Sequence, residues 1–304
     1  IYTQAKFLDW RLLGYTSYFA FRARYAIIQT IHMGPRSFKK VTGYQRVEEL
    51  AKKVASFSFR VTKDECLDLP EKIYTSRDVE LTPEQSKAYA SMKQLAMVEL
   101  QEGGISSASI ALTQLLRLHQ IVCGHLKMDD GVITAFPNRR INALMEILAE
   151  TSGKVIIWAN YVEDIKAIVR AISEEKDGDD QPLYGPKSVV EFWGAIDAKT
   201  RKENNDAFQD PKSGVRFFVG NQATGGMGID LFAANTVIYY SNSYKLDDRM
   251  QSEDRAHRIG QRKPVTYVDL ISRGTVDEKI IQALRNKMNI AQQITGDNYR
   301  EWLI

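Results

Sequence analysis

Cysteine and long apolar runs are both scarce in this sequence. The chain of 304 residues has only two cysteines, Cys66 and Cys123. Two thiols cannot form a disulfide framework, and they indicate a reducing compartment. No apolar run approaches the roughly 20 residues that a membrane helix needs, and the first residues show no signal-peptide pattern. The sequence therefore excludes a disulfide-stapled secreted domain and predicts no membrane partner.

An excess of charge of one sign is also missing. The chain has 41 Lys and Arg against 38 Asp and Glu, a formal net charge of +3. This balance is too small to indicate nucleic acid by itself, so any basic surface must come from local arrangement. The length allows two compact units, each with its own core. Because the sequence opens at Ile1 directly in patterned sequence, we expect a fragment of a longer protein.

Two common nucleotide-binding patterns are absent. No expected strand is followed by GxxxxGK[ST], and there is no GxGxxG fingerprint, so the chain alone is not expected to hold nucleotide phosphates in the P-loop manner. A metal site is not expected either. His119, Cys123 and His125 lie close in sequence, but there is no fourth ligand at suitable spacing, and their apolar neighbours are typical of helix packing.

Residues 1–135 have the texture of a mainly helical region. Helices are predicted by apolar spacing or by capping residues at 47–57, 83–101 and 107–122. An apolar and aromatic cluster runs from Phe7 to Ile28. Between this cluster and the predicted helices lies the basic and aromatic stretch RSFKKVTGYQR, at 36–46. We expect a loop there, either solvated or in contact with a DNA backbone.

From residue 136 onward, short β-branched runs alternate with amphipathic segments. Strands are predicted at 154–160, 188–193, 215–220, 235–241 and 265–271, and helices at 140–150, 161–173, 198–208, 246–257 and 275–294. Continuously apolar strands that alternate with helices indicate a parallel sheet covered on both faces. In such sheets ligands bind outside the carboxyl ends of the strands. The chemistry is therefore expected in the loops that follow the strands of 136–304.

Two stretches of the second region stand out. NQATGGMGIDL (221–231) has glycines that allow the backbone to approach a ligand closely, although a tight turn would also use them. In QSEDRAHRIGQ (251–261), Arg255 and Arg258 are three residues apart and would share a face of a helix. Such a pair could direct two guanidinium groups at one anion. The alternative is a pair of surface arginines bound to neighbouring carboxylates.

In this order and at this separation, the two stretches resemble the fifth and sixth motifs of the Swi/Snf family of superfamily-two helicases, approximately AGGxGINL and QAxDRAHRIGQ. Further similarities lie in KVIIWANYVEDIKAI (154–168), in Gly194, Arg201 and Phe208, and in 265–284, with looser ones in LPEK (69–72) and in 115–126. The strong match spans 154–284. The chain departs from the family pattern at Asp230, where Asn is usual, at Gln222, where Thr is usual, and at 244–246.

The resemblance implies the second, C-terminal RecA-like lobe of a DNA-stimulated ATPase: an α/β fold of the P-loop NTPase type at 136–304, preceded by a helical insertion at 1–135. It implies arginine fingers at Arg255 and Arg258, with Gln251 as a third catalytic residue. Nucleotide contacts are expected at Gly226, Gly228, Asp230 and Asp254, and contacts to the DNA backbone at Asn160, Gly194, Gln222 and Thr224. The location would be cytoplasmic or nucleoid-associated, or nuclear in a eukaryote.

ATP and Mg²⁺ would be bound mainly by a first, N-terminal RecA-like lobe of the same protein, which would be a partner together with double-stranded DNA. This fragment is therefore expected to be inactive by itself. Two other interpretations remain open: a RecA-like module that docks on DNA or protein without catalysis, and a helicase that separates strands.

Overall fold

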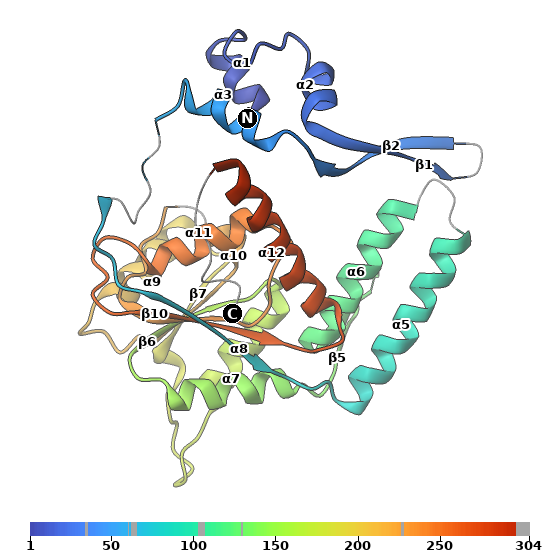
Figure 1. The fold of residues 1–304 in the computed structure, drawn as a ribbon. Coiled ribbons are helices and arrows are strands. Elements are labelled where there is room, and N and C mark those ends of the chain that lie inside the picture. Colours follow the sequence, from blue (N-terminus) through green and yellow to red (C-terminus); the bar gives the residue numbers. More distant parts are fainter. Residues whose placement is uncertain are drawn as a thin grey trace.

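The computed structural model describes residues 1–33, 36–59, 61, 66–102, 107–128, 130–225 and 228–295. Figure 1 shows a helix-covered sheet, a pair of long helices beside it, and an N-terminal group of short helices with a two-stranded ribbon. None of the helices in the described ranges is long and apolar enough to cross a membrane.

A parallel sheet forms the centre of the fold, as the sequence predicts. Its strands are β3 (Lys72–Asp78), β6 (Lys154–Trp158), β7 (Val189–Phe192), β8 (Phe217–Gly220), β9 (Ala234–Tyr239) and β10 (Val265–Ile271). Their order is β3-β10-β9-β6-β8-β7, and every neighbouring pair is parallel. The central strands are almost completely buried because helices cover both faces of the sheet.

Successive residues of β6 point to opposite faces and enter two separate cores. Val155 and Ile157 pack with α7 (Arg139–Glu150) and α8 (Val162–Glu174). Ile156 and Trp158 pack with Phe208 of α9 (Ala198–Gln209) and Ala256 of α11 (Leu246–Ala256). Complete burial of one such large apolar side chain contributes about 1.5–3 kcal/mol. The predicted three-layer arrangement is thus confirmed.

The stretch 36–46 is not the loop that we expected. Ala26–Met33 (β1) and Arg36–Tyr44 (β2) form an antiparallel ribbon, with Thr30 opposite Lys39. Residues 26–33 belong to the region expected to be mainly helical, although β-branched residues on both sides of a Gly-Pro dipeptide are typical of a hairpin. Gly34 and Pro35 themselves lie outside the described residues.

A second difference concerns a strand within residues 1–135, the region expected to be mainly helical. Strand β3 lies within the region expected to be helical, yet it pairs with β10 over the full length of both strands. Its exposure alternates because it is an edge strand, and its short polar composition hides the pattern of a buried strand. The sheet therefore recruits a strand from the first region of the chain.

The expected long helices are present as α5 (Pro83–Glu102) and α6 (Ser107–Cys123). Leu118 and Val122 of α6 pack against Val276 and Leu284 of the last described helix, α12 (Val276–Thr295). The N-terminal helices α1 (Tyr2–Leu8), α2 (Tyr18–Tyr25) and α3 (Val47–Ala55) share a small core of their own, and α3 packs against α12. Short elements complete the chain: β4 (His125–Lys127), β5 (Ile133–Ala135), η2 (Pro186–Ser188) and α10 (Gln222–Gly225).

His119 and His125 face carboxylates rather than a shared ligand site. The Nε2 atom of His119 lies 3.2 Å from Asp277, and the Nδ1 atom of His125 lies 3.1 Å from Asp164. Throughout the part of the chain that the structure describes, no three His, Cys, Asp or Glu side chains converge so as to hold a metal ion.

A buried ion pair joins α7 to the start of α12. Arg140 is 1% exposed and pairs with Asp277, and it also donates to the carbonyl oxygens of Tyr240, at 2.6 Å, and Leu270, at 3.2 Å. Burial would raise the pKa of the Asp277 carboxyl, but the Arg140 cation and a hydrogen bond from His119 outweigh burial and hold this pKa well below its usual range. The pair is therefore charged, and both Nη atoms of Arg140 have hydrogen-bond partners.

We predict that Arg140→Ala lowers the free energy of unfolding by about 3–5 kcal/mol, because it leaves the Asp277 charge buried without its partner. Urea unfolding followed by tryptophan fluorescence measures this loss. Arg139→Ala is the matched control: among the described residues, Arg139 forms an ion pair with Glu80 alone, and that pair is exposed, so the change should stay within about 0.5 kcal/mol. Equal effects of the two substitutions would contradict the structural role of Arg140.

Candidate nucleotide and DNA site

Helix α11 ends before the second of the two arginines in the 251–261 stretch. Its last residue is Ala256, and His257 leaves helical geometry with φ −93° and ψ 82°. Gly260 follows with φ +105°, and a side chain there would press on the ring of Phe232 at 3.3 Å. The expectation that Arg255 and Arg258 share a helical face is therefore wrong. Arg255 lies in the last turn of the helix, and Arg258 lies in the turn that follows it.

The two arginines nevertheless converge on one short segment, 229–231. The Nη1 atom of Arg255 lies 3.4 Å from the carbonyl oxygen of Ile229, and the backbone N–H of Leu231 donates to the carbonyl oxygen of Arg255 at 2.9 Å. Arg258 forms an ion pair with Asp230, and both side chains are partly exposed. The fifth and sixth motifs thus meet in space.

This cluster holds two cations beside the carboxylates of Asp230 and Asp254. Partial burial lowers the pKa of the Arg255 guanidinium, and the neighbouring Arg258 cation lowers this pKa further. Two like charges that are held close together repel each other, and an anion between them relieves that repulsion. Within this group Asp230 already supplies one negative charge to Arg258.

The arginine cluster does not lie at the carboxyl edge of the sheet, where we expected the chemistry. The side-chain amide of Gln261 donates to the carbonyl oxygens of Phe232, Ala234 and Ala256, at 3.1, 2.8 and 3.3 Å. Ala234 is the first residue of β9, and residue 261 leads into β10. The cluster is therefore at the amino ends of these two strands, because α11 runs antiparallel to them.

The residues expected at DNA follow the carboxyl ends of β6, β7 and β8. Asn160 is half-buried, and its backbone N–H donates to Ser241 Oγ at 2.8 Å. Gly194 is exposed in a loop, and its carbonyl oxygen accepts a hydrogen bond from Arg201 at 3.1 Å. Thr224 is half-buried in α10. The side chain of Asn221 ties two of these loops together by donating to the carbonyl oxygen of Asn160 at 2.8 Å.

Gln222 differs from the other members of this set because it is only 2% exposed. Its amide lies 3.5 Å from the Asn242 side chain and 3.4 Å from the backbone N–H of Ser243. Its side chain therefore supports the loop after β9. Gln251 is exposed on α11 and Asp254 is half-buried, while Gly228 is exposed with φ +62°. Gly226 lies outside the described residues.

Residues 139–260 match the family model of the helicase conserved C-terminal domain. The chain is 30% identical to an uncharacterized ATP-dependent helicase of Mycoplasma genitalium over 260 residues, 84% of this chain and 24% of that protein. It is 43% identical to the chromatin-remodeling ATPase INO80 of Mycosarcoma maydis over 170 residues, 56% of this chain and 8% of that protein.

Solved structures that resemble this chain belong to the same kind of protein. A Sulfolobus solfataricus SWI2/SNF2 ATPase core in complex with double-stranded DNA has a TM-score of 0.58 and 29% identity, covering 98% of this chain and 60% of that one. The C-terminal domain of a SWI2/SNF2 ATPase from the same organism has a TM-score of 0.55 and 26% identity, covering 77% and 93%. This chain is a C-terminal helicase lobe of the Swi/Snf type. It spans about a quarter or less of the two curated relatives described above.

A buried network that the sequence analysis missed holds α11 on the sheet of this Swi/Snf lobe. Arg249 is 1% exposed and binds Asp269 with two hydrogen bonds, at 2.6 and 3.0 Å. Arg249 also donates to Glu253 at 2.8 Å and to Asn242 at 2.9 Å. Burial opposes the charge of Arg249, but the Asp269 carboxylate outweighs burial and raises the pKa of the guanidinium.

The network extends to the edge strand β3. The Tyr74 hydroxyl donates to Glu253 at 2.8 Å, and Lys72 lies 3.4 Å from the same carboxylate. His257 of the Swi/Snf sixth motif lies 2.7 Å from the carbonyl oxygen of Pro70. An acidic residue inside the apolar run VTYVDLI, Asp269, was the available signal, since a buried carboxylate needs a partner.

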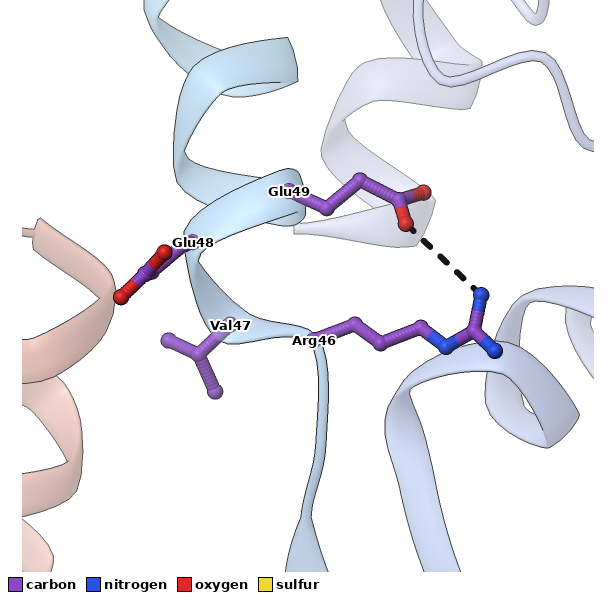
Figure 2. A pocket seen from close by; sticks show the side chains of 4 residues that line it. All are labelled: Arg46, Val47, Glu48 and Glu49. Atoms are coloured by element: carbon purple, nitrogen blue, oxygen red, sulfur yellow. Dashed lines mark ion pairs between the residues drawn. The ribbon is translucent and has the colours of Figure 1, made fainter.

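A hollow of about 700 Å³ lies at the start of α3, where it is lined by Arg46, Val47, Glu48 and Glu49. Figure 2 shows the Arg46 guanidinium directed at Glu49, 4.0 Å away, with Glu48 on the other side of the backbone. Two carboxylates and one cation do not suit the phosphates of a nucleotide. The arginine cluster of the Swi/Snf lobe is thus the better candidate site.

We predict that Gln261→Ala lowers the free energy of unfolding by about 1–3 kcal/mol, because it leaves three carbonyl oxygens without their shared donor. Urea unfolding of the purified chain measures the change. Gln251→Ala, in the same motif but on the exposed face of α11, should cost less than about 0.5 kcal/mol. A larger loss for Gln251→Ala than for Gln261→Ala would contradict this division.

Proposed function

We propose that this Swi/Snf lobe closes over ATP held by a first RecA-like lobe of the same protein and thereby drives movement along double-stranded DNA. The convergence of Arg255 and Arg258 on segment 229–231 carries the proposal. Both cations come from the string that resembles the family's sixth motif, and both are only partly buried.

The two arginines would act as arginine fingers. Negative charge spreads over the transferred phosphoryl group during hydrolysis, and placed guanidinium groups stabilise it, an effect worth about 10³–10⁵ in rate in related NTPases. The partial burial that lowers the pKa of Arg255 also reduces screening by water, so its cation would act at greater strength. In the closed state, phosphate oxygens would take the place of Asp230 beside Arg258.

ATP and Mg²⁺ would be brought by the other lobe. The sequence contains no GxxxxGK[ST] loop, and no metal-binding group of His, Cys, Asp or Glu occurs among the described residues. Gly228 and Asp230 would approach the nucleotide from this side, with Gln251 and Asp254 orienting the fingers. Gly226 would belong to the same loop.

Duplex DNA would lie along the carboxyl edge of β6, β7 and β8. Backbone groups near Asn160, Gly194 and Thr224 would contact phosphates, which position a protein on DNA without reading its sequence. Gln222 would act indirectly, by supporting the loop at Asn242. The similarity to a SWI2/SNF2 ATPase core bound to double-stranded DNA favours a duplex translocase over a strand-separating enzyme or a non-catalytic docking module.

In the intact protein, Arg258→Ala should lower ATP turnover at least a hundredfold while DNA affinity stays within about twofold. Steady-state phosphate release and fluorescence anisotropy with a labelled duplex measure the two quantities. Arg262→Ala provides the control, because Arg262 is an exposed cation only four residues away. Turnover of Arg258→Ala close to that of the control would exclude the finger role.

The 304-residue chain alone should hydrolyse ATP no faster than buffer, with or without duplex DNA, because it lacks a phosphate-binding loop. A phosphate-release assay at saturating ATP tests this expectation. Robust hydrolysis that DNA stimulates would place the phosphate loop within this chain and would overturn the division of the active site between two lobes.

A further inference from the structure

Residues 10–47 carry a charge pattern unlike the rest of the chain. They include seven basic residues, Arg11, Arg22, Arg24, Arg36, Lys39, Lys40 and Arg46, and no Asp or Glu. One residue in eight of the whole chain is acidic, so a stretch of this length would ordinarily contain several. This segment has a charge of +7 in a chain whose net charge is +3, which leaves −4 for all other residues.

Much of this charge lies on the β1–β2 ribbon. The ribbon is a separate two-stranded sheet, about 26 Å long at the usual rise of a strand. Gln29 and Thr30 are adjacent and therefore point to opposite faces, and both are exposed. Figure 1 shows the ribbon extending away from the N-terminal helices. Isolated two-stranded ribbons are marginally stable in water, so a partner would stabilise this one.

Two carboxylates beside this segment bind arginines that lie outside the ribbon. Glu49 binds Arg24 at 2.7 Å and accepts from the Tyr25 hydroxyl at 3.0 Å. Asp9 binds Arg11 at 2.7 Å. Lys39 is exposed, and none of the ion pairs between described residues includes it. The charge of Lys39 is thus available to a partner outside the lobe.

We propose that the β1–β2 ribbon binds the phosphate backbone of double-stranded DNA, as a second contact separate from the carboxyl edge of the sheet. The cations would be Arg36, Lys39 and Lys40, at register positions opposite Met33, Thr30 and Gln29. A two-stranded ribbon fits the major groove of B-DNA, which is about 12 Å wide. This inference rests on the proposed function, since it assumes that the protein acts on duplex DNA.

The test uses the triple variant Arg36→Gln/Lys39→Gln/Lys40→Gln of the intact protein and a labelled mixed-sequence duplex of about 30 base pairs, with Kd measured at several salt concentrations. Each phosphate contact contributes about 0.9 to the slope of log affinity against log salt. We expect the slope to fall by about two to three and the Kd at about 0.1 M salt to rise at least tenfold. ATP turnover without DNA should be unchanged.

The control removes three exposed lysines at the opposite, amino edge of the sheet: Lys176→Gln/Lys187→Gln/Lys212→Gln. The variant Lys39→Arg/Lys40→Arg keeps the charge and should bind like the wild type. Equal Kd and salt slope for the ribbon variant and the control would overturn the proposal. So would unchanged DNA binding combined with lost binding to polyglutamate, which would indicate an acidic protein partner. Failure of the wild type itself to bind duplex would instead refute the proposed function.

Discussion

The buried guanidinium of Arg249 is the interaction on which the arrangement of this lobe depends. It is bound by Asp269 on β10, by Glu253 on its own helix and by Asn242 in the loop after β9. Removing three charged groups from water is costly unless each has partners of good geometry. Because these partners lie on β10, on α11 and in the loop after β9, the network holds the helix on the sheet, and with it Arg255.

The same helix joins the two ends of the sheet. At its start, Asn242 contacts Gln222 beside the loops expected to meet DNA. At its end, Arg255 and Arg258 reach segment 229–231. A helix of 11 residues spans about 16 Å. Between these points, Gln222, Asn242, Arg249 and Glu253 form a continuous chain of polar contacts that ends two residues before Arg255.

Most of the fold could be predicted from the sequence because its signals are local. The strand at 265–271 is observed as β10 with the same bounds, and the helix expected at 246–257 is α11. Apolar periodicity of this kind depends on neighbouring residues only. The ribbon at 26–44 and the edge strand β3 were missed, because neither has the continuous apolar run by which a buried strand is recognised.

For the candidate site, the sequence alone determined the family and the residue types that can do the chemistry. The motif at 251–261 contains the two arginines, and its position after the motif at 221–231 identifies a Swi/Snf lobe. Only the tertiary structure decided how those residues are used. The end of α11 at Ala256 separates Arg255 from Arg258, Asp230 pairs with Arg258, and Gln222 and Gln261 turn inward. These outcomes depend on contacts between residues far apart in the chain, which spacing along the sequence does not encode.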